Sequence, residues 1–277
     1  MALEMVKIAH GDVTAEVVPE RGALVSSLRV RGREVLYLDR TTLKDLSKNV
    51  RGGIPLLFPF ASKLVDEVFV PAGTKMKQHG FARAKPWRVV EKRADAVRVA
   101  LVQDAYTASH FPYEYEAEQA ATVLPHGLHV ELLIVNKGVK PLPVSPGWHP
   151  YFQCTAAQKN TVTGDVAGLA SDKLTNDRVF DFGLVAPVTG RANFQIPRMG
   201  TMRLSFSPEM RHLQFWSEPG KDFICIEPFH GPPNTINTPQ RCDIPPGQAL
   251  LLDAHRSALE VEVSKGPRIQ DCKRTSV

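Results

Sequence analysis

The chain has 277 residues, 43% of them hydrophobic and 23% charged, which is typical of a globular protein with enough apolar residues for a core. It contains no run of 18 or more apolar residues and no charged-then-apolar stretch at its start, so we expect neither a membrane span nor a secretory signal. The formal net charge of +5 fits an acidic small-molecule ligand, and it equally fits a merely basic surface without nucleic acid.

Strand patterns dominate the chain. Three hairpins are predicted where alternating apolar and polar residues flank short turns: 24–30 with 33–38 around Gly32, 87–92 with 96–102, and 113–124 with 128–135. Further strands are predicted at 203–207, 212–218, 222–227 and 249–264. Helical periodicity is scarce, and only residues 41–50 are expected to form one short helix.

Many short strands, separated by 22 prolines and 19 glycines, predict an all-β fold, namely a large antiparallel β-sandwich. No linker, composition break or internal repeat divides the chain, so we expect a single domain over residues 1–264. Residues 265–277 carry few apolar side chains and are predicted to form a disordered tail.

The four cysteines lie far apart and show no CxxC spacing; they are Cys154, Cys225, Cys242 and Cys272. They are expected to be reduced thiols of a cytoplasmic protein and not a disulfide framework.

One predicted strand runs directly into a charge. Residues 223–226, "FICI", are apolar enough to be buried on both faces, yet Glu227 and Pro228 follow at once. The strand could simply end there with an exposed carboxylate, or it could hold Glu227 in place for chemistry. In the second case Pro228 would stop the strand so that the carboxylate faces a cleft.

Three further segments place charged or titratable side chains between apolar residues. They are "VRGGIPLLFPF" with Arg51, "QHGFARAKPW" with His79 and Arg83, and "SPGWHPYF" with His149. Such surroundings desolvate a side chain and shift its pKa, as acid/base catalysis requires. The simpler alternatives are a core histidine that is already hydrogen-bonded and a surface ion pair for Arg51.

The stretch "HGLHVE" suggests a metal site, because it holds His126, His129 and Glu131. On a strand His129 and Glu131 would share a face, since side chains alternate with period two. His126, however, falls in the predicted turn, and no fourth ligand lies nearby. We therefore interpret this stretch as an exposed hairpin and expect no metal there.

The order of the four segments resembles the hexose-6-phosphate mutarotase branch of the aldose 1-epimerase family. The resemblance rests on "RGGIPLLFPF", "QHGFAR", "GWHPYF" and "ICIEPFHGPPNTINT", followed by "IPPGQALLL", and it covers nearly the whole chain except the tail. It implies a galactose-mutarotase-like β-sandwich with a sugar site in an open cleft. The chain departs from the family pattern at residues 60–63, "FASK", and at Phe229-His230, where a tryptophan and a small residue are common.

By this resemblance Glu227 corresponds to the general base, His149 to the general acid and His79 to a second sugar-contacting histidine. Arg51 and Arg83 correspond to the basic residues that face the phosphate. The implied reaction interconverts the α and β anomers of an aldohexose, most specifically a hexose 6-phosphate, by ring opening and closure. It needs no metal and no cofactor. Trp148 and Tyr151 are expected to shape the pocket or to stack on the sugar.

Three alternatives remain open at this point. The enzyme could act on neutral aldoses such as galactose or glucose, the chain could be a carbohydrate-binding sandwich without catalysis, or "HGLHVE" could support a cupin-like metal enzyme. The partner in the favoured interpretation is a small sugar or sugar phosphate, bound by a monomer.

Overall fold

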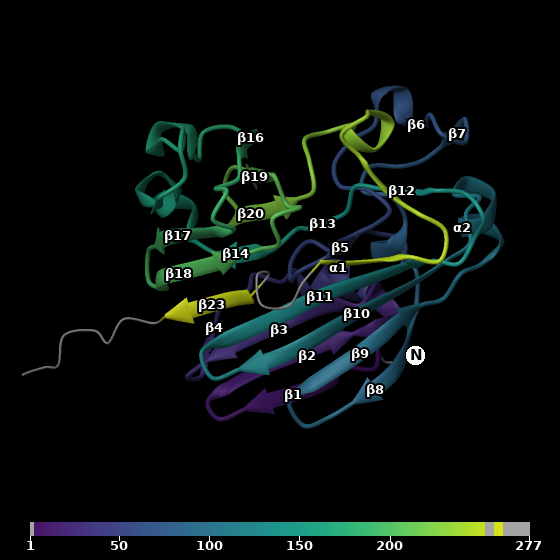
Figure 1. The fold of residues 1–277 in the computed structure, drawn as a ribbon. Helices are drawn as coiled ribbons and strands as arrows, with labels where there is room; N and C mark the ends of the chain where they lie inside the picture. The colour runs from purple at the N-terminus through teal and green to yellow at the C-terminus, as the bar shows by residue number, and fades with distance from the viewer. Residues whose placement is uncertain (1–2, 253–257, 263–277) are drawn as a thin grey trace, which may run out of the picture.

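The structure is a computed structural model that describes residues 3–252 and 258–262, and antiparallel strands make up most of its regular secondary structure (Figure 1). The predicted all-β fold class is therefore confirmed. No helix in these described residues is long and apolar enough to cross a membrane. The predicted tail, residues 265–277, and the C-terminal boundary of the predicted domain at residue 264 lie outside the described residues.

A four-stranded sheet of consecutive hairpins opens the fold; it consists of β1 (Val6–His10), β2 (Val13–Val18), β3 (Leu24–Val30) and β4 (Arg33–Glu34). The first two of these strands were not predicted. The turn at Gly32 is confirmed, with φ of +75°, but its second strand is shorter than expected. Beyond β4, Leu36 and Leu38 form isolated β-bridges with Phe152 and Gly52, because the chain turns toward the cleft described below.

A nine-stranded sheet packs beside it in the described part of the chain. Its path runs β15 (Thr163–Gly164), β17 (Arg191–Ile196), β18 (Gly200–Ser205), β23 (Ala258–Glu262), β11 (Gly127–Asn136), β10 (Tyr115–Leu124), β9 (Ala96–Leu101) and β8 (Trp87–Lys92), and β22 (Ala249–Leu252) also pairs with β11. The two predicted hairpins at 87–102 and 113–135 are confirmed here.

The sandwich core lies between these two sheets, where β1 and β2 contact β10 (Figure 1). Along β10 every second side chain is buried, as expected for a strand with one face on a core. One cluster of buried hydrophobic side chains extends from Val6 to Leu252. This continuity favours the proposal that the chain forms a single domain.

A six-stranded sheet carries the polar segments singled out in the sequence. It runs β16 (Phe180–Val185), β19 (His212–Ser217), β20 (Phe223–Phe229), β13 (Gly147–Trp148) and β5 (Leu56–Leu57), with β14 (Tyr151–Gln153) also paired to β20. Two small sheets complete the described strands, β6 (Val68–Phe69) with β7 (Thr74–Lys75) and β12 (Leu142–Val144) with β21 (Cys242–Ile244).

The helices are short. α1 (Arg40–Lys44) begins at Asp39, whose side chain accepts from the amides of Thr41 and Thr42, and it ends at Asp45. The predicted helix at 41–50 is therefore right in its first half and wrong in its second. α2 (Ala105–His110) was not predicted, and it begins with a capping box at Asp104 and Thr107. The remaining helical turns are 3₁₀, at residues 19–21, 65–67, 82–84, 156–161, 171–173 and 235–237.

Candidate active site

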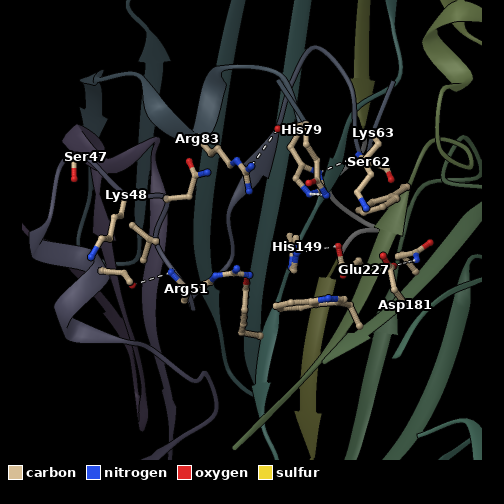
Figure 2. Close-up of a pocket in the computed structure, with 18 residues that line it drawn as sticks. Ser47, Lys48, Arg51, Ser62, Lys63, His79, Arg83, His149, Asp181 and Glu227 are labelled. Carbon is tan, nitrogen blue, oxygen red and sulfur yellow. Dashed lines mark hydrogen bonds and ion pairs between the residues drawn. The ribbon is translucent and has the colours of Figure 1, made fainter. Parts of the chain in front are cut away.

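A cavity of about 610 Å³ opens over the six-stranded sheet and collects residues from all four polar segments (Figure 2). Its charged and hydrogen-bonding lining includes Ser47, Lys48, Arg51, Ser62, Lys63, Gln78, His79, Arg83, His149, Tyr151, Asp181, Gln214, Trp216 and Glu227. All five predicted site residues therefore lie in one cleft, although they are up to 176 positions apart in the chain, from Arg51 to Glu227.

Glu227 lies on β20, and the alternation of this strand decides where its carboxylate points. Ile224 and Ile226 belong to the main core cluster, so Cys225 and Glu227 face the opposite side of the strand, where Glu227 lines the cleft and Cys225 packs with Tyr151 and Phe223. The side chain of Glu227 is almost completely buried, with a relative exposure of 1% for the residue. The simpler interpretation of an exposed carboxylate at a strand end is therefore wrong.

The predicted role of Pro228 is wrong as well, because β20 continues through it to Phe229. Pro228 pairs with Leu213 of β19. On its other side β20 changes partner at this point, from β14 opposite residues 223–225 to β13 opposite residue 229. A proline, which lacks an N–H, is tolerated where a ladder is interrupted in this way.

His149 lies between β13 and β14, and its Nε2 is 3.4 Å from Oε2 of Glu227. Its backbone N–H donates to the carbonyl of Pro55, and its ring stacks on Tyr151 with 4.7 Å between centroids and 8° between planes. Nδ1 is buried and has no hydrogen-bond partner in the described structure. A satisfied core histidine would have such a partner, so this ring is better explained as a functional group.

Burial shifts the pKa values of this pair in opposite directions. Desolvation raises the pKa of Glu227 well above its usual value, and Asp181 raises it further while Arg83 opposes the shift. Desolvation lowers the pKa of His149 to about 3, and the charge of Arg83 adds to the effect. Both shifts disfavour the charged form of each group. The pair is therefore best described as two groups that share one proton over a wide pH range.

His79 is held as a neutral hydrogen-bond donor. The backbone N–H of Ser62 donates to Nδ1 over 2.9 Å, so the proton of the neutral ring resides on Nε2. Nε2 lies 3.0 Å from Nε2 of Gln78; since both atoms carry protons, we assign the Gln78 amide in the opposite orientation, with its oxygen accepting from His79. Burial and the charge of Arg83 hold the pKa of His79 well below its usual range. Its backbone φ of +69° is unusual outside glycine, so the surrounding structure must hold this residue in place.

The two arginines are not equivalent. The half-exposed Arg51 lies 3.4 Å from a carboxylate oxygen of Glu218 and covers the ring of Trp216. Arg83 donates to the carbonyl of Gln78, and it has no carboxylate partner in the described part of the chain. Burial lowers the pKa of Arg83 to about 10, which reflects a guanidinium that is poorly solvated and not neutralised.

Gly52 and Gly80, in the segments that carry Arg51 and Arg83, lie where another backbone segment passes very close. A Cβ at Gly52, which has φ of +134°, would lie 2.5 Å from the Cα of Leu38. A Cβ at Gly80, with φ of +65°, would lie 2.4 Å from the carbonyl oxygen of Phe58. These positions therefore need glycine so that neighbouring segments can approach each other.

Several lining residues were missed by the sequence analysis. Asp181 of β16 accepts from Gln214 Nε2 over 2.5 Å, and Gln214 lies opposite Glu227 on the neighbouring strand. Trp216 lines the cleft, whereas Trp148 is buried in the core with its Nε1 donating to Gln119. The expectation that Trp148 would contact the sugar is therefore wrong, while Tyr151 does line the cleft.

The "HGLHVE" stretch lies in the β10–β11 hairpin, far from the cleft lining. His126 is exposed at the turn as predicted, but His129 is buried. In the described residues, the cluster whose ligand atoms come close enough to hold a metal ion is a different one, formed by His149, Cys225 and Glu227.

Comparison with known proteins decides the family. The model of the aldose 1-epimerase family matches residues 4–193, about two thirds of the chain. The chain belongs to the aldose 1-epimerase family. The family resemblance seen in the sequence is thus confirmed.

Solved structures share the fold. The crystal structure of the Slr1438 protein from Synechocystis sp. PCC 6803 is 30% identical, with a TM-score of 0.84 over 91% of this chain and 94% of that one. A galactose mutarotase-like protein from Lactobacillus casei is 23% identical, with a TM-score of 0.74 over 94% and 99% of the two chains. The expected galactose-mutarotase-like fold is confirmed.

A curated relative from Escherichia coli (strain K12) bears the name "Putative glucose-6-phosphate 1-epimerase". It is 27% identical over 170 residues, which is 58% of this chain and 52% of that protein. The match therefore spans about half of each protein.

Proposed function

We propose that this protein interconverts the α and β anomers of an aldohexose 6-phosphate by acid/base opening and reclosure of the ring. The observation that carries the proposal is the buried pair of Glu227 and His149, 3.4 Å apart on the floor of the cleft. The relative named for glucose 6-phosphate supports the substrate class. A protein that only binds carbohydrate would not need such a pair.

The single shared proton gives the reaction a cycle. In the reactive form Glu227 is a carboxylate that takes the proton of the anomeric hydroxyl, while the imidazolium of His149 protonates the ring oxygen. Ring opening leaves a neutral carboxyl and a neutral imidazole. The aldehyde carbon turns about the first carbon–carbon bond, and the two transfers then run in reverse. The pair ends with the protonation state with which it began.

Burial supports this cycle. Desolvation disfavours the carboxylate–imidazolium form and favours the neutral pair, which is the form that accompanies the open-chain sugar. Once the reactive form is present, the site therefore favours transfer of both protons, although the neutral pair is also its resting form with the closed sugar. His79 carries its proton on Nε2, where Gln78 is the present neighbour, and we propose that a sugar hydroxyl takes the place of Gln78 there, because Nδ1 is already occupied by the Ser62 amide.

We assign the phosphate chiefly to Arg83. Its guanidinium has no carboxylate partner in the described structure and lies in the cleft, whereas Arg51 is already paired with Glu218. Fork-shaped guanidinium donors suit phosphate oxygens. Arg51 is proposed to add long-range attraction and only a weaker direct contact.

The test is an anomer-exchange measurement by NMR, with glucose 6-phosphate, glucose and galactose side by side. Faster exchange of the phosphorylated sugar is expected. Equal catalysis of all three sugars would assign the protein to neutral aldoses, and no catalysis of any sugar would leave carbohydrate binding. The monomeric state and cytoplasmic location expected from the sequence remain predictions.

A further inference from the structure

A third buried group lies beside the catalytic pair and has no part in the proposed reaction. Cys225 precedes Glu227 by two positions on β20, so its side chain points to the same face of the strand. One ligand atom each of His149, Cys225 and Glu227 lies within 4.8 Å of the other two. All three residues are buried.

The spacing of these donors approaches that of a zinc site. Zinc binds imidazole nitrogen and carboxylate oxygen at about 2.0–2.2 Å and thiolate sulfur at about 2.3 Å, usually in a tetrahedron. Two such ligands on one tetrahedral ion are about 3.4 Å apart. The distance between His149 Nε2 and Glu227 Oε2 is 3.4 Å, so this edge already fits. The Cys225 sulfur needs a shift on the order of 1 Å at most.

The local structure allows this adjustment. His149 has no partner at Nδ1 in the described residues, so its ring is not fixed by a second hydrogen bond. Cys225 belongs to an apolar cluster with Tyr151 and Phe223, against which Trp216 packs. An apolar wall excludes water on that side and strengthens electrostatic contacts with a bound ion. His149 and Glu227 also line the cleft, so a fourth position is open to water or a sugar oxygen.

The nearby charges act in both directions. The charges of Arg83 and Arg51 act on His149, that of Arg83 on Glu227, and those of Arg51 and Lys159 on Cys225, so these three cations repel a metal ion. Asp181 and Glu218 are the carboxylates on the same side of the sheet that offset them. The donor set of one nitrogen, one sulfur and one oxygen is suited to a borderline-soft ion and poorly suited to magnesium or calcium.

We propose that His149, Cys225 and Glu227 bind one Zn²⁺ ion, and that this ion inhibits the enzyme in competition with the sugar. The ion would bind the lone pairs of His149 and Glu227, and these groups could then no longer exchange protons with the substrate. Binding of zinc does not depend on the proposed function, whereas its inhibitory effect does.

Binding is tested on the full chain with Co²⁺ as an optical probe, followed by displacement with Zn²⁺. A thiolate ligand gives Co²⁺ a charge-transfer absorption in the near ultraviolet, and we expect this band to saturate at one equivalent. Cys225→Ala should remove the band and weaken zinc binding at least about tenfold, since loss of even an outer partner costs about 10–100-fold. Cys154→Ala is the matched control, because Cys154 is also a buried free thiol but does not belong to the His149, Cys225 and Glu227 cluster, and it should keep the band.

Inhibition is measured for each variant relative to its own rate without zinc. Zinc should raise the apparent KM of the wild type, a chelator should restore the rate, and Cys225→Ala should need at least about tenfold more zinc. Absence of the band in the wild type, its loss in Cys154→Ala, or its persistence in Cys225→Ala would overturn the proposal. So would stimulation by zinc. If no mutarotase activity exists, the cobalt titration still decides whether the metal site is present.

Discussion

Removal of the Arg83 guanidinium gives the sharpest test of the proposed substrate. Arg83 lies in the cleft with no carboxylate partner in the described chain, and burial lowers its pKa to about 10. A phosphate would supply the missing counter-charge. A hydrogen bond to a charged group contributes about 1.5–3 kcal/mol, so Arg83→Ala should lower kcat/KM for glucose 6-phosphate about 10- to 100-fold.

The same substitution also acts on the catalytic pair, because the charge of Arg83 lowers the pKa of both Glu227 and His149. At a pH between the acid and alkaline limbs the pair holds one proton with either sugar, so there this shift is common to both sugars. The quantity to measure is therefore the ratio of kcat/KM for glucose 6-phosphate to kcat/KM for glucose, in which the common effect cancels. Arg83→Ala should lower this ratio about 10- to 100-fold, and Arg51→Ala should lower it less because Arg51 is paired with Glu218.

Arg88→Ala serves as the control, since Arg88 is an exposed arginine on β8 outside the cleft. It should leave the ratio unchanged. Inorganic phosphate should compete with glucose 6-phosphate in the wild type and lose this effect in Arg83→Ala, and added salt should weaken the wild-type preference. A ratio unaffected by Arg83→Ala would refute the assignment of the phosphate to this residue.

Three further outcomes are expected. Glu227→Gln should fold normally and lose about 10²–10⁴-fold in kcat, and activity within twofold of wild type, measured by NMR anomer exchange, would exclude it as the base. His149→Asn should lower kcat more than it raises KM, and the double variant should lose less than the product of the two single losses; multiplicative losses would contradict a shared proton. Prolonged treatment with a chelator should leave the exchange rate of the zinc-free enzyme unchanged, and loss that zinc or manganese restores would show that the reaction needs a metal.

The sequence predicted the residues of the site better than it predicted their arrangement. The position of Glu227 follows from strand alternation, because the core isoleucines of β20 leave the odd-numbered side chains on the other face. The same rule, applied to the extended segment around His149, would have placed the adjacent Trp148 away from the cleft, where the structure has it. That expectation failed because aromatic character was given more weight than the alternation.

Other features could not be predicted because they depend on tertiary pairing. Arg51 meets Glu218, which is 167 positions later and directly follows β19. Asp181 lies on the edge strand β16, which pairs with β19, and β19 in turn pairs with β20. Its place in the cleft therefore depends on the order of these three strands in the sheet. Its surroundings, "VFDFGLV", carry no pattern that distinguishes it from any exposed aspartate in a strand. Only the register of the six-stranded sheet brings these groups together.

The electrostatics of the pair also predict how the enzyme responds to pH. Activity requires the state with one shared proton, which a second proton abolishes at low pH and deprotonation abolishes at high pH. Desolvation lowers the pKa of His149 to about 3, so kcat/KM for glucose should hold on the acid side far below the ordinary histidine value near 6.5, as long as the protein stays folded. Desolvation raises the pKa of Glu227, so the alkaline limb should lie well above the ordinary carboxyl range.

A bound phosphate should move the alkaline limb of kcat, which reports the substrate-bound enzyme, whereas the limb of kcat/KM reports the free enzyme and is the same for every sugar. Arg83 lowers the pKa of Glu227, and an anion on Arg83 offsets this effect, so the limb for glucose 6-phosphate should lie at higher pH than the limb for glucose. Both limbs are measured by NMR exchange after the uncatalysed rate at each pH is subtracted. In Arg83→Ala the two sugars should give the same alkaline limb. An acid limb near pH 6.5 would contradict the shared proton, because it would mean that a well-solvated imidazolium is the acid. If the two sugars gave the same alkaline limb of kcat in the wild type, the phosphate would not neutralise Arg83.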